Sequence, residues 1–137
     1  MFVEKKGGMG MIRGIRGATT VGKNEETEII EATKQLLIEM IEANGIQAED
    51  VVSVFISVTK DLFATFPAKA LRKIEGWTYV PVMCMQEIPV PNSLEKCIRI
   101  MMHVETSVLQ KEIRHIYLNN AVVLRPDLVN SNQSHQT

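Results

Sequence analysis

One long amphipathic segment, residues 24–45, constrains the fold of this chain more than any other. Six of its residues recur at helical spacing and share one apolar face: Ile29, Thr33, Leu36, Leu37, Met40 and Ile41. Asn24 is placed to cap the start of this helix, and acidic residues follow in the first turn, where they suit the helix dipole. Gly45 can adopt the left-handed conformation that commonly ends a helix. A helix with one apolar face needs another surface to cover it.

Segments in which apolar residues alternate with other residues precede and follow this helix in the sequence. They predict β-strands, and a sheet of such strands could cover the apolar face of the helix. The five predicted strands are residues 11–15, 51–59, 78–85, 98–104 and 113–118. In the clearest strand one face is entirely apolar and consists of Val52, Val54, Ile56 and Val58. Pro81 cannot donate a hydrogen bond to a neighbouring strand, so the third strand is predicted at an edge or a bulge.

A second, shorter helix is predicted between the second and third strands. Pro67 fits the first helical position, and Gly76 fits just beyond the end. The resulting order predicts an α/β (α+β) fold, a mixed sheet of about five strands with helices packed on one face. The other face mixes apolar residues with Ser53 and Ser57, so we expect another surface to cover it.

The size and composition of the chain fit one ordinary globular domain. It has 137 residues, of which 45% are hydrophobic, and its 15 basic residues are balanced by 16 acidic ones. That balance argues against nucleic acid as a partner, and no apolar run is long enough to cross a membrane. Two cysteines are too few for a disulfide framework. We expect a flexible leader at 1–10, a domain at 11–128 and a flexible tail at 129–137.

Four charged or phenolic residues lie within the predicted strands or close to their ends, where most neighbours are apolar: Arg16, Glu87, Arg99 and Tyr117. Either arginine alone would most often be a solvated surface residue. Together, on different strands, they indicate a pocket for a small polyanion, because guanidinium groups match carboxylates bidentately.

Six ordered segments resemble the signature segments of the monofunctional, trimeric chorismate mutases. They are GIRGATT at 14–20, FPAKA at 66–70, GWTYVPVMCMQE at 76–87, CIRIMMHV at 97–104, IRHIYL at 113–118 and VVLRPDL at 122–128. The resemblance spans nearly the whole predicted domain. It implies a homotrimer with central sheets and active sites between neighbouring subunits.

The resemblance also implies a reaction, the concerted rearrangement of chorismate to prephenate in aromatic amino-acid biosynthesis. No proton is transferred in this reaction and no covalent intermediate forms. The enzyme holds a near-attack conformer and stabilises charge that develops on the ether oxygen. We therefore expect a cytoplasmic isomerase that needs no cofactor and no metal and binds neither nucleic acid nor membrane.

The same resemblance assigns roles to individual residues. Arg99 corresponds to the cation facing the ether oxygen and a neighbouring carboxylate, and Arg16 to an arginine that holds the side-chain carboxylate. Glu87 and Cys84 correspond to the pair bonded to the ring hydroxyl, and Tyr117 to a carboxylate-binding phenol. The neighbouring subunit would supply Phe66, Ala68 and Lys69, with Lys69 near a carboxylate. The pocket wall or its mobile cover would contain Arg72, Val82, Leu124 and Arg125. Met83 departs from the family, which has a smaller hydroxyl-bearing residue there, and would contribute backbone contacts.

Two other functions stay open at this point. A non-catalytic trimeric binding module would need the arginines, but it has no reason to place Glu87 and Cys84 beside them, because a carboxylate near a dianion is costly. A hydrolase using Glu87 as its base would need an oxyanion or metal motif. Neither His103 nor His115 has a second ligand at metal spacing.

Overall fold

A computed structural model describes residues 10–127. Its strands are β1 Met11–Thr20, β2 Val51–Val58, β3 Val82–Gln86, β4 Cys97–Thr106 and β5 Ile116–Tyr117, and its α-helix is α1 Glu26–Asn44. Short 3-10 helices are η1 Ala48–Asp50, η2 Pro67–Lys73, η3 Gln110–Glu112 and η4 Asn119–Leu124. The expected leader and tail lie, apart from Gly10, outside the described residues.

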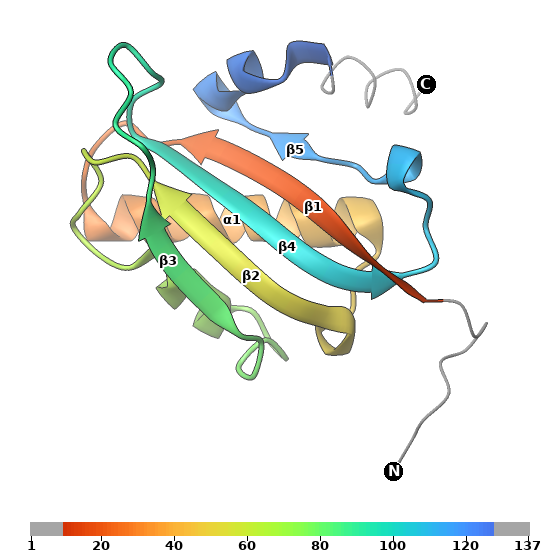
Figure 1. Cartoon of the computed structure of the whole chain (residues 1–137). Coiled ribbons are helices and arrows are strands. Elements are labelled where there is room, and N and C mark those ends of the chain that lie inside the picture. Colours follow the sequence, from red (N-terminus) through yellow and green to blue (C-terminus); the bar gives the residue numbers. More distant parts are fainter. Residues whose placement is uncertain (1–9, 128–137) are drawn as a thin grey trace.

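The five strands form one mixed sheet in the order β3-β2-β4-β1-β5. Strand β4 is antiparallel to both β1 and β2, whereas β3 is parallel to β2 and β5 is parallel to β1. Helix α1 crosses behind this sheet, and within residues 10–127 no helix crosses the opposite face (Figure 1). The predicted fold class, a mixed five-stranded sheet with helices on one face, is confirmed.

The hydrophobic core lies between α1 and the sheet. Fully buried side chains from both layers meet there, among them Ile15, Leu36, Leu37, Met40, Ile56 and Met102. Burial of apolar surface in such a core stabilises the fold by roughly 25 cal/mol per Å². The apolar face predicted for the helix is therefore the face that packs on the sheet, although Ile41 at its margin is only partly buried.

The two ends of α1 compare differently with the prediction. Gly45 ends the helix as predicted, with φ 61° and its N–H donating to the Ile41 carbonyl. The predicted cap Asn24 is wrong, because Glu25 occupies the N-cap position and makes no capping hydrogen bond with its side chain. Asn24 Oδ1 instead accepts hydrogen bonds from the N–H groups of Phe63 and Ala64, at 2.9 and 3.0 Å. Its side chain therefore ties a distant loop to the start of the helix.

Strand β1 is longer than the predicted 11–15 because its glycines do not interrupt it. At Gly17 the helix comes so close that a Cβ atom would lie 2.4 Å from Met40 Sδ and 3.1 Å from Leu36 Cδ1. The glycine thus permits close packing of α1 on β1.

The predicted apolar face of β2 is wrong at Val52, because a β-bulge interrupts the alternation of that strand. The register against β4 shifts between Val51 and Ser53. Val51 is consequently buried, at 8% exposure, whereas Val52 is 50% exposed. The extra residue turns Val52 away from the core, which alternation alone could not predict.

The remaining elements follow the prediction in kind but differ in length. Strand β3 lies at the edge of the sheet, as the proline at 81 indicated, and it begins directly after that residue. The short helix has 3-10 geometry, with Pro67 in its first turn. Strand β5 contains only two residues of the predicted 113–118. Arg114 pairs instead with the side chain of Asn44, which accepts from its N–H and donates to its carbonyl, both at 2.9 Å.

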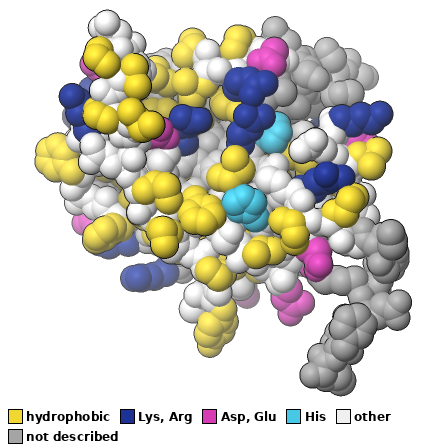
Figure 2. All heavy atoms as spheres, viewed as in Figure 1, with side chains coloured by type: hydrophobic (Ala, Val, Ile, Leu, Met, Phe, Trp, Pro, Cys, Tyr) yellow, Lys and Arg dark blue, Asp and Glu magenta, His cyan; other side chains and the backbone are white. Residues whose placement is uncertain are grey.

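The helix-free face of the sheet is here called the open face. Strand register places on it Arg16, Ala18, Phe55, Ser57, Met85, Arg99, Met101 and His103. Figure 2 looks onto this side and shows apolar, basic and histidine side chains next to one another. Within residues 10–127, no helix combines the length and apolar character that a bilayer crossing requires.

Candidate active site

The two predicted arginines project from the open face on adjacent strands. Arg16 lies opposite Met101 and Arg99 lies opposite Ala18 in the antiparallel pairing of β1 with β4. Their neighbours Ile15 and Ile98 are buried toward α1, so the pleat of each strand turns the arginine the other way. The sheet therefore brings together two cations that lie 83 positions apart in sequence.

A hollow of about 570 Å³ opens beside these arginines. Six predicted site residues line it: Arg16, Glu87, Arg99, Tyr117, Leu124 and Arg125. They come from β1, the end of β3, β4, β5 and the η4 region. Three arginines against one carboxylate make the hollow suitable for a ligand with more than one negative charge.

Glu87 is held in this hollow by three contacts. Its Oε1 lies 3.4 Å from Nη1 of Arg99, its Oε2 accepts a hydrogen bond from Ser57 Oγ, and its backbone N–H donates to the Val58 carbonyl at 2.9 Å. Ser57 was not predicted as a functional residue. The signal available was its position on the same polar sheet face as Arg99.

A second unpredicted contact comes from His115, just before β5. Its Nδ1 accepts a hydrogen bond from the backbone N–H of Arg16 at 2.9 Å. Burial, together with the positive charges of Arg16 and Arg125, lowers the pKa of His115 to about 4. This histidine is therefore neutral at neutral pH and acts as an acceptor.

The predicted pairing of Cys84 with Glu87 does not occur within one chain. Cys84 is in register with the core residue Ile56, so its side chain faces α1, on the side of the sheet opposite Arg99. Burial raises the pKa of the Cys84 thiol, which disfavours a thiolate.

Cys84 instead shares a different hollow with two residues that were expected to serve a neighbouring subunit. This hollow measures about 510 Å³ and includes Phe66, Lys69 and Cys84 in its lining. Phe66 is 70% exposed, and Lys69 Nζ pairs with Glu26 Oε2 at 2.8 Å. One chain thus carries two separate groups of predicted site residues.

The four remaining predicted residues lie on η2 and β3, the elements that also carry Lys69 and Cys84. Val82 and Met83 lie on edge strand β3, where Met83 is 60% exposed. Ala68 and Arg72 belong to η2; Ala68 packs against the core and Arg72 is exposed. The structure therefore does not bring these four residues to the arginine-lined hollow of their own chain.

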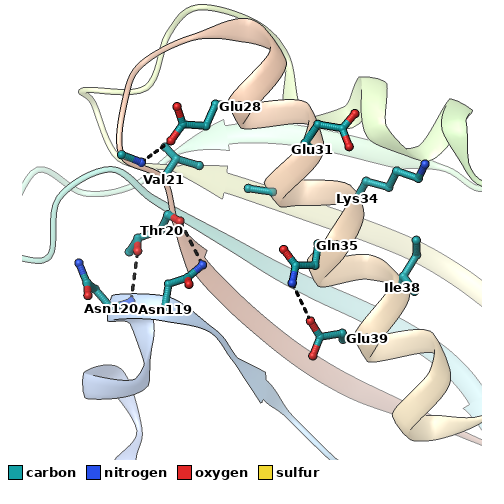
Figure 3. A pocket seen from close by; sticks show the side chains of 12 residues that line it. Thr20, Val21, Glu28, Glu31, Lys34, Gln35, Ile38, Glu39, Asn119 and Asn120 are labelled. Carbon is teal, nitrogen blue, oxygen red and sulfur yellow. Dashed lines mark hydrogen bonds between the residues drawn. The ribbon is translucent and has the colours of Figure 1, made fainter.

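A larger hollow of about 780 Å³ lies elsewhere, between α1 and the start of η4 (Figure 3). It contains none of the predicted site residues. Lys34 is its single basic side chain, beside Glu28, Glu31 and Glu39. Its polar groups also bond to one another, as Gln35 does to Glu39. An acidic wall of this kind does not suit a polyanion.

The fold is that of a chorismate mutase. The family model for chorismate mutase type I matches residues 12–128, and the chain belongs to that family of isomerases. It is 60% identical to chorismate mutase AroH of Bacillus subtilis (strain 168) over 118 residues, covering 86% of this chain and 93% of that protein. It is 48% identical to chorismate mutase AroH of Thermus thermophilus over 119 residues, with 86% and 97% covered.

A solved structure agrees with these relatives. The chorismate mutase from Clostridium thermocellum (Cth-682) superimposes with a TM-score of 0.78 at 55% sequence identity, covering 80% of this chain and 97% of that one. The fold and the family predicted from the sequence are both confirmed by these comparisons.

Proposed function

We propose that this protein converts chorismate to prephenate in a cleft formed by two neighbouring chains of a homotrimer. The observation that carries the proposal is the hollow in which Arg16, Arg99 and Arg125 surround Glu87 and Tyr117. Chorismate has two carboxylates, a ring hydroxyl and an ether oxygen, and this set of side chains offers a partner to each of them.

The rearrangement requires the enzyme to position chorismate and to stabilise the negative charge that develops on its ether oxygen. Arg16 and Tyr117 bind carboxylate, and Glu87 accepts a hydrogen bond from the ring hydroxyl. Arg99 faces the ether oxygen, which gains negative charge as its C–O bond breaks. Because a fixed guanidinium needs no reorganisation at that moment, it stabilises the transition state more than bound chorismate. Leu124 and Arg125 border the same hollow and complete its wall.

The second group of residues serves the site of an adjacent subunit. Phe66 and Lys69 lie in a hollow of their own, apart from the arginines of the same chain. Association through the open face, which carries exposed apolar side chains such as Met85, would join one group to the other. Ala68, Arg72, Val82, Met83 and Cys84 then belong to this lent half, and Cys84 meets the Glu87 of another chain.

We further propose that residues 11–128 form the catalytic domain and that the protein is located in the cytoplasm. Cys84 and Cys97 are both free thiols, which suits a reducing compartment.

The decisive experiment adds chorismate to the purified protein, follows the loss of its ultraviolet absorbance and identifies the product. We expect prephenate, formed at the same rate with and without EDTA. The matched control is a folded Arg99→Ala variant at the same concentration. If folded wild-type protein yields no prephenate, the proposed function is wrong.

A further inference from the structure

The two carboxylate oxygens of Glu87 have different partners. Oε2 accepts the hydrogen bond from Ser57 Oγ, whereas Oε1 lies 3.4 Å from Arg99 Nη1. The contact with Arg99 is therefore long and single-pronged. This is unusual for an arginine beside a carboxylate, because the two groups match in shape and commonly form two parallel hydrogen bonds.

Strand pairing puts Ser57 where it can keep these groups apart. Ser57 lies opposite Arg99 on β4 and opposite Met85 on β3. Its hydroxyl thus emerges between the strand that carries Arg99 and the strand end that leads to Glu87. The next residue, Val58, accepts the backbone N–H of Glu87 at 2.9 Å. Consecutive residues of β2 consequently hold both the backbone and the side chain of Glu87.

We propose that Ser57 is a positioning residue that prevents Glu87 from closing bidentately onto Arg99. This inference rests on the proposed function, in which Arg99 must direct its positive charge at the ether oxygen. A carboxylate bound through both oxygens would neutralise that charge and occupy the donors that the ether oxygen needs. By engaging Oε2, the Ser57 hydroxyl leaves the guanidinium available to the substrate.

Steady-state kinetics with chorismate tests this role. In Ser57→Ala we expect kcat to fall about tenfold, as for loss of one hydrogen bond to a charged group, while KM changes less than about twofold. The reason is that Arg99 acts mainly in the transition state. Ser57→Thr keeps the hydroxyl and suits a strand, so it should recover most of kcat.

Ser53→Ala is the matched control. Ser53 lies on the same strand and face, but its hydroxyl is bonded to His103 Nδ1, at 3.2 Å, and not to Glu87. We expect its kcat to stay within about twofold of wild type, since the tenfold loss is specific to the bond with the charged group.

A double-mutant cycle separates positioning from general damage to the strand. A neutral amide cannot form an ion pair with Arg99, so Ser57→Ala should cost less than about twofold in a Glu87→Gln background. An unchanged kcat in Ser57→Ala, or an equal loss in both backgrounds, would overturn this inference while an active wild type upheld the mutase function. A folded wild type without mutase activity would overturn the proposed function itself.

Discussion

Arg99 and Arg16 border the same hollow, but we expect them to act at different stages of the reaction. The carboxylate assigned to Arg16 is charged before and after the rearrangement, whereas the ether oxygen assigned to Arg99 gains charge only on the way to the transition state. Interactions that strengthen during the reaction raise kcat, and interactions of constant strength lower KM.

Substitution of the two arginines should therefore give different kinetic signatures. We expect Arg99→Ala to lose roughly a hundredfold or more in kcat, the usual effect of removing a preorganised donor. Arg99→Lys should recover only part, because an ammonium group cannot span two oxygens as a guanidinium does. Arg16→Ala should raise KM at least as strongly as it lowers kcat. Steady-state kinetics, with folding checked by circular dichroism, measures this, and an Arg99→Ala effect confined to KM would contradict the assignment.

Some individual residues of the site could be predicted from the sequence. Arg16, Glu87, Arg99 and Tyr117 could be grouped because charged and phenolic side chains are uncommon beside apolar strand residues, and the structure places all four around one hollow. Ser57 and His115 could not be recognised, since a serine or histidine in a strand becomes informative only when its hydrogen-bond partner is known.

Strand β5 is joined to the sheet by a short backbone pairing and by a hydrogen bond to the side chain of His115. It pairs with β1 through only two residues, Ile116 and Tyr117. The bond from the Arg16 N–H to His115 extends this junction by one residue. Because a charged imidazolium cannot accept a hydrogen bond, protonation of His115 would remove that link.

The lowered pKa of His115, which is due first to burial and then to the positive charges of Arg16 and Arg125, makes stability depend on pH between about 4 and 6.5. In that window the unfolded chain binds a proton at His115 and the folded chain does not, so the free energy of unfolding falls as pH falls from 6.5 toward 4. The contribution is fully present above pH 6.5. We expect His115→Asn, which keeps an acceptor for Arg16, to show a shallower pH dependence than wild type. Urea unfolding of both proteins across pH 4–7 measures the difference, and identical slopes would contradict it.

The contact of α1 with β1 leads to a prediction about Gly17. A methyl group there would collide with Met40 Sδ and Leu36 Cδ1 inside the core. We expect Gly17→Ala to lower the free energy of unfolding by about 1–3 kcal/mol, the usual cost of overpacking. Gly14→Ala on the same strand is the control, because its added methyl would meet only Met101 Sδ, at 3.2 Å. Denaturant titration that ranked the two variants equally would contradict this.

Element types were predictable where a pattern was long, as in α1, but boundaries depended on partners. The bulge that exposes Val52 arises from pairing with β4, and the shortening of β5 arises from the two bonds between Asn44 and Arg114. Both are interactions between residues distant in sequence. The local alternation of apolar residues contains no information about such interactions. The strands could therefore be predicted, but some of their ends and buried faces were predicted wrongly.

For the whole molecule, the division of site residues between two hollows favours sites shared between subunits, and the resemblance to the trimeric chorismate mutases implies that the assembly is a trimer. Light scattering should give three times the 15.4 kDa mass of the chain. A monomer that kept full activity would contradict shared sites.

Mixed trimers provide a sharper test of the same prediction. Arg99→Ala damages one group of residues and Lys69→Ala the other, so each variant alone should be weak. Trimers refolded from an equal mixture should have both groups intact in about a quarter of their sites and regain activity. Arg99→Ala mixed with Glu87→Ala is the control. Because both changes lie in the same group, we expect no recovery from that mixture.

The sheet order has a consequence for how this protein is made. Strand β1 leaves the ribosome first, yet its two neighbours, β4 and β5, are the last strands to be synthesised. At 5–20 residues per second, roughly 4–15 s pass between the end of β1 and the start of β4. Throughout that interval the apolar residues of β1 have no strand to pair with. The sheet can therefore be completed only after the C-terminal third of the chain has been synthesised.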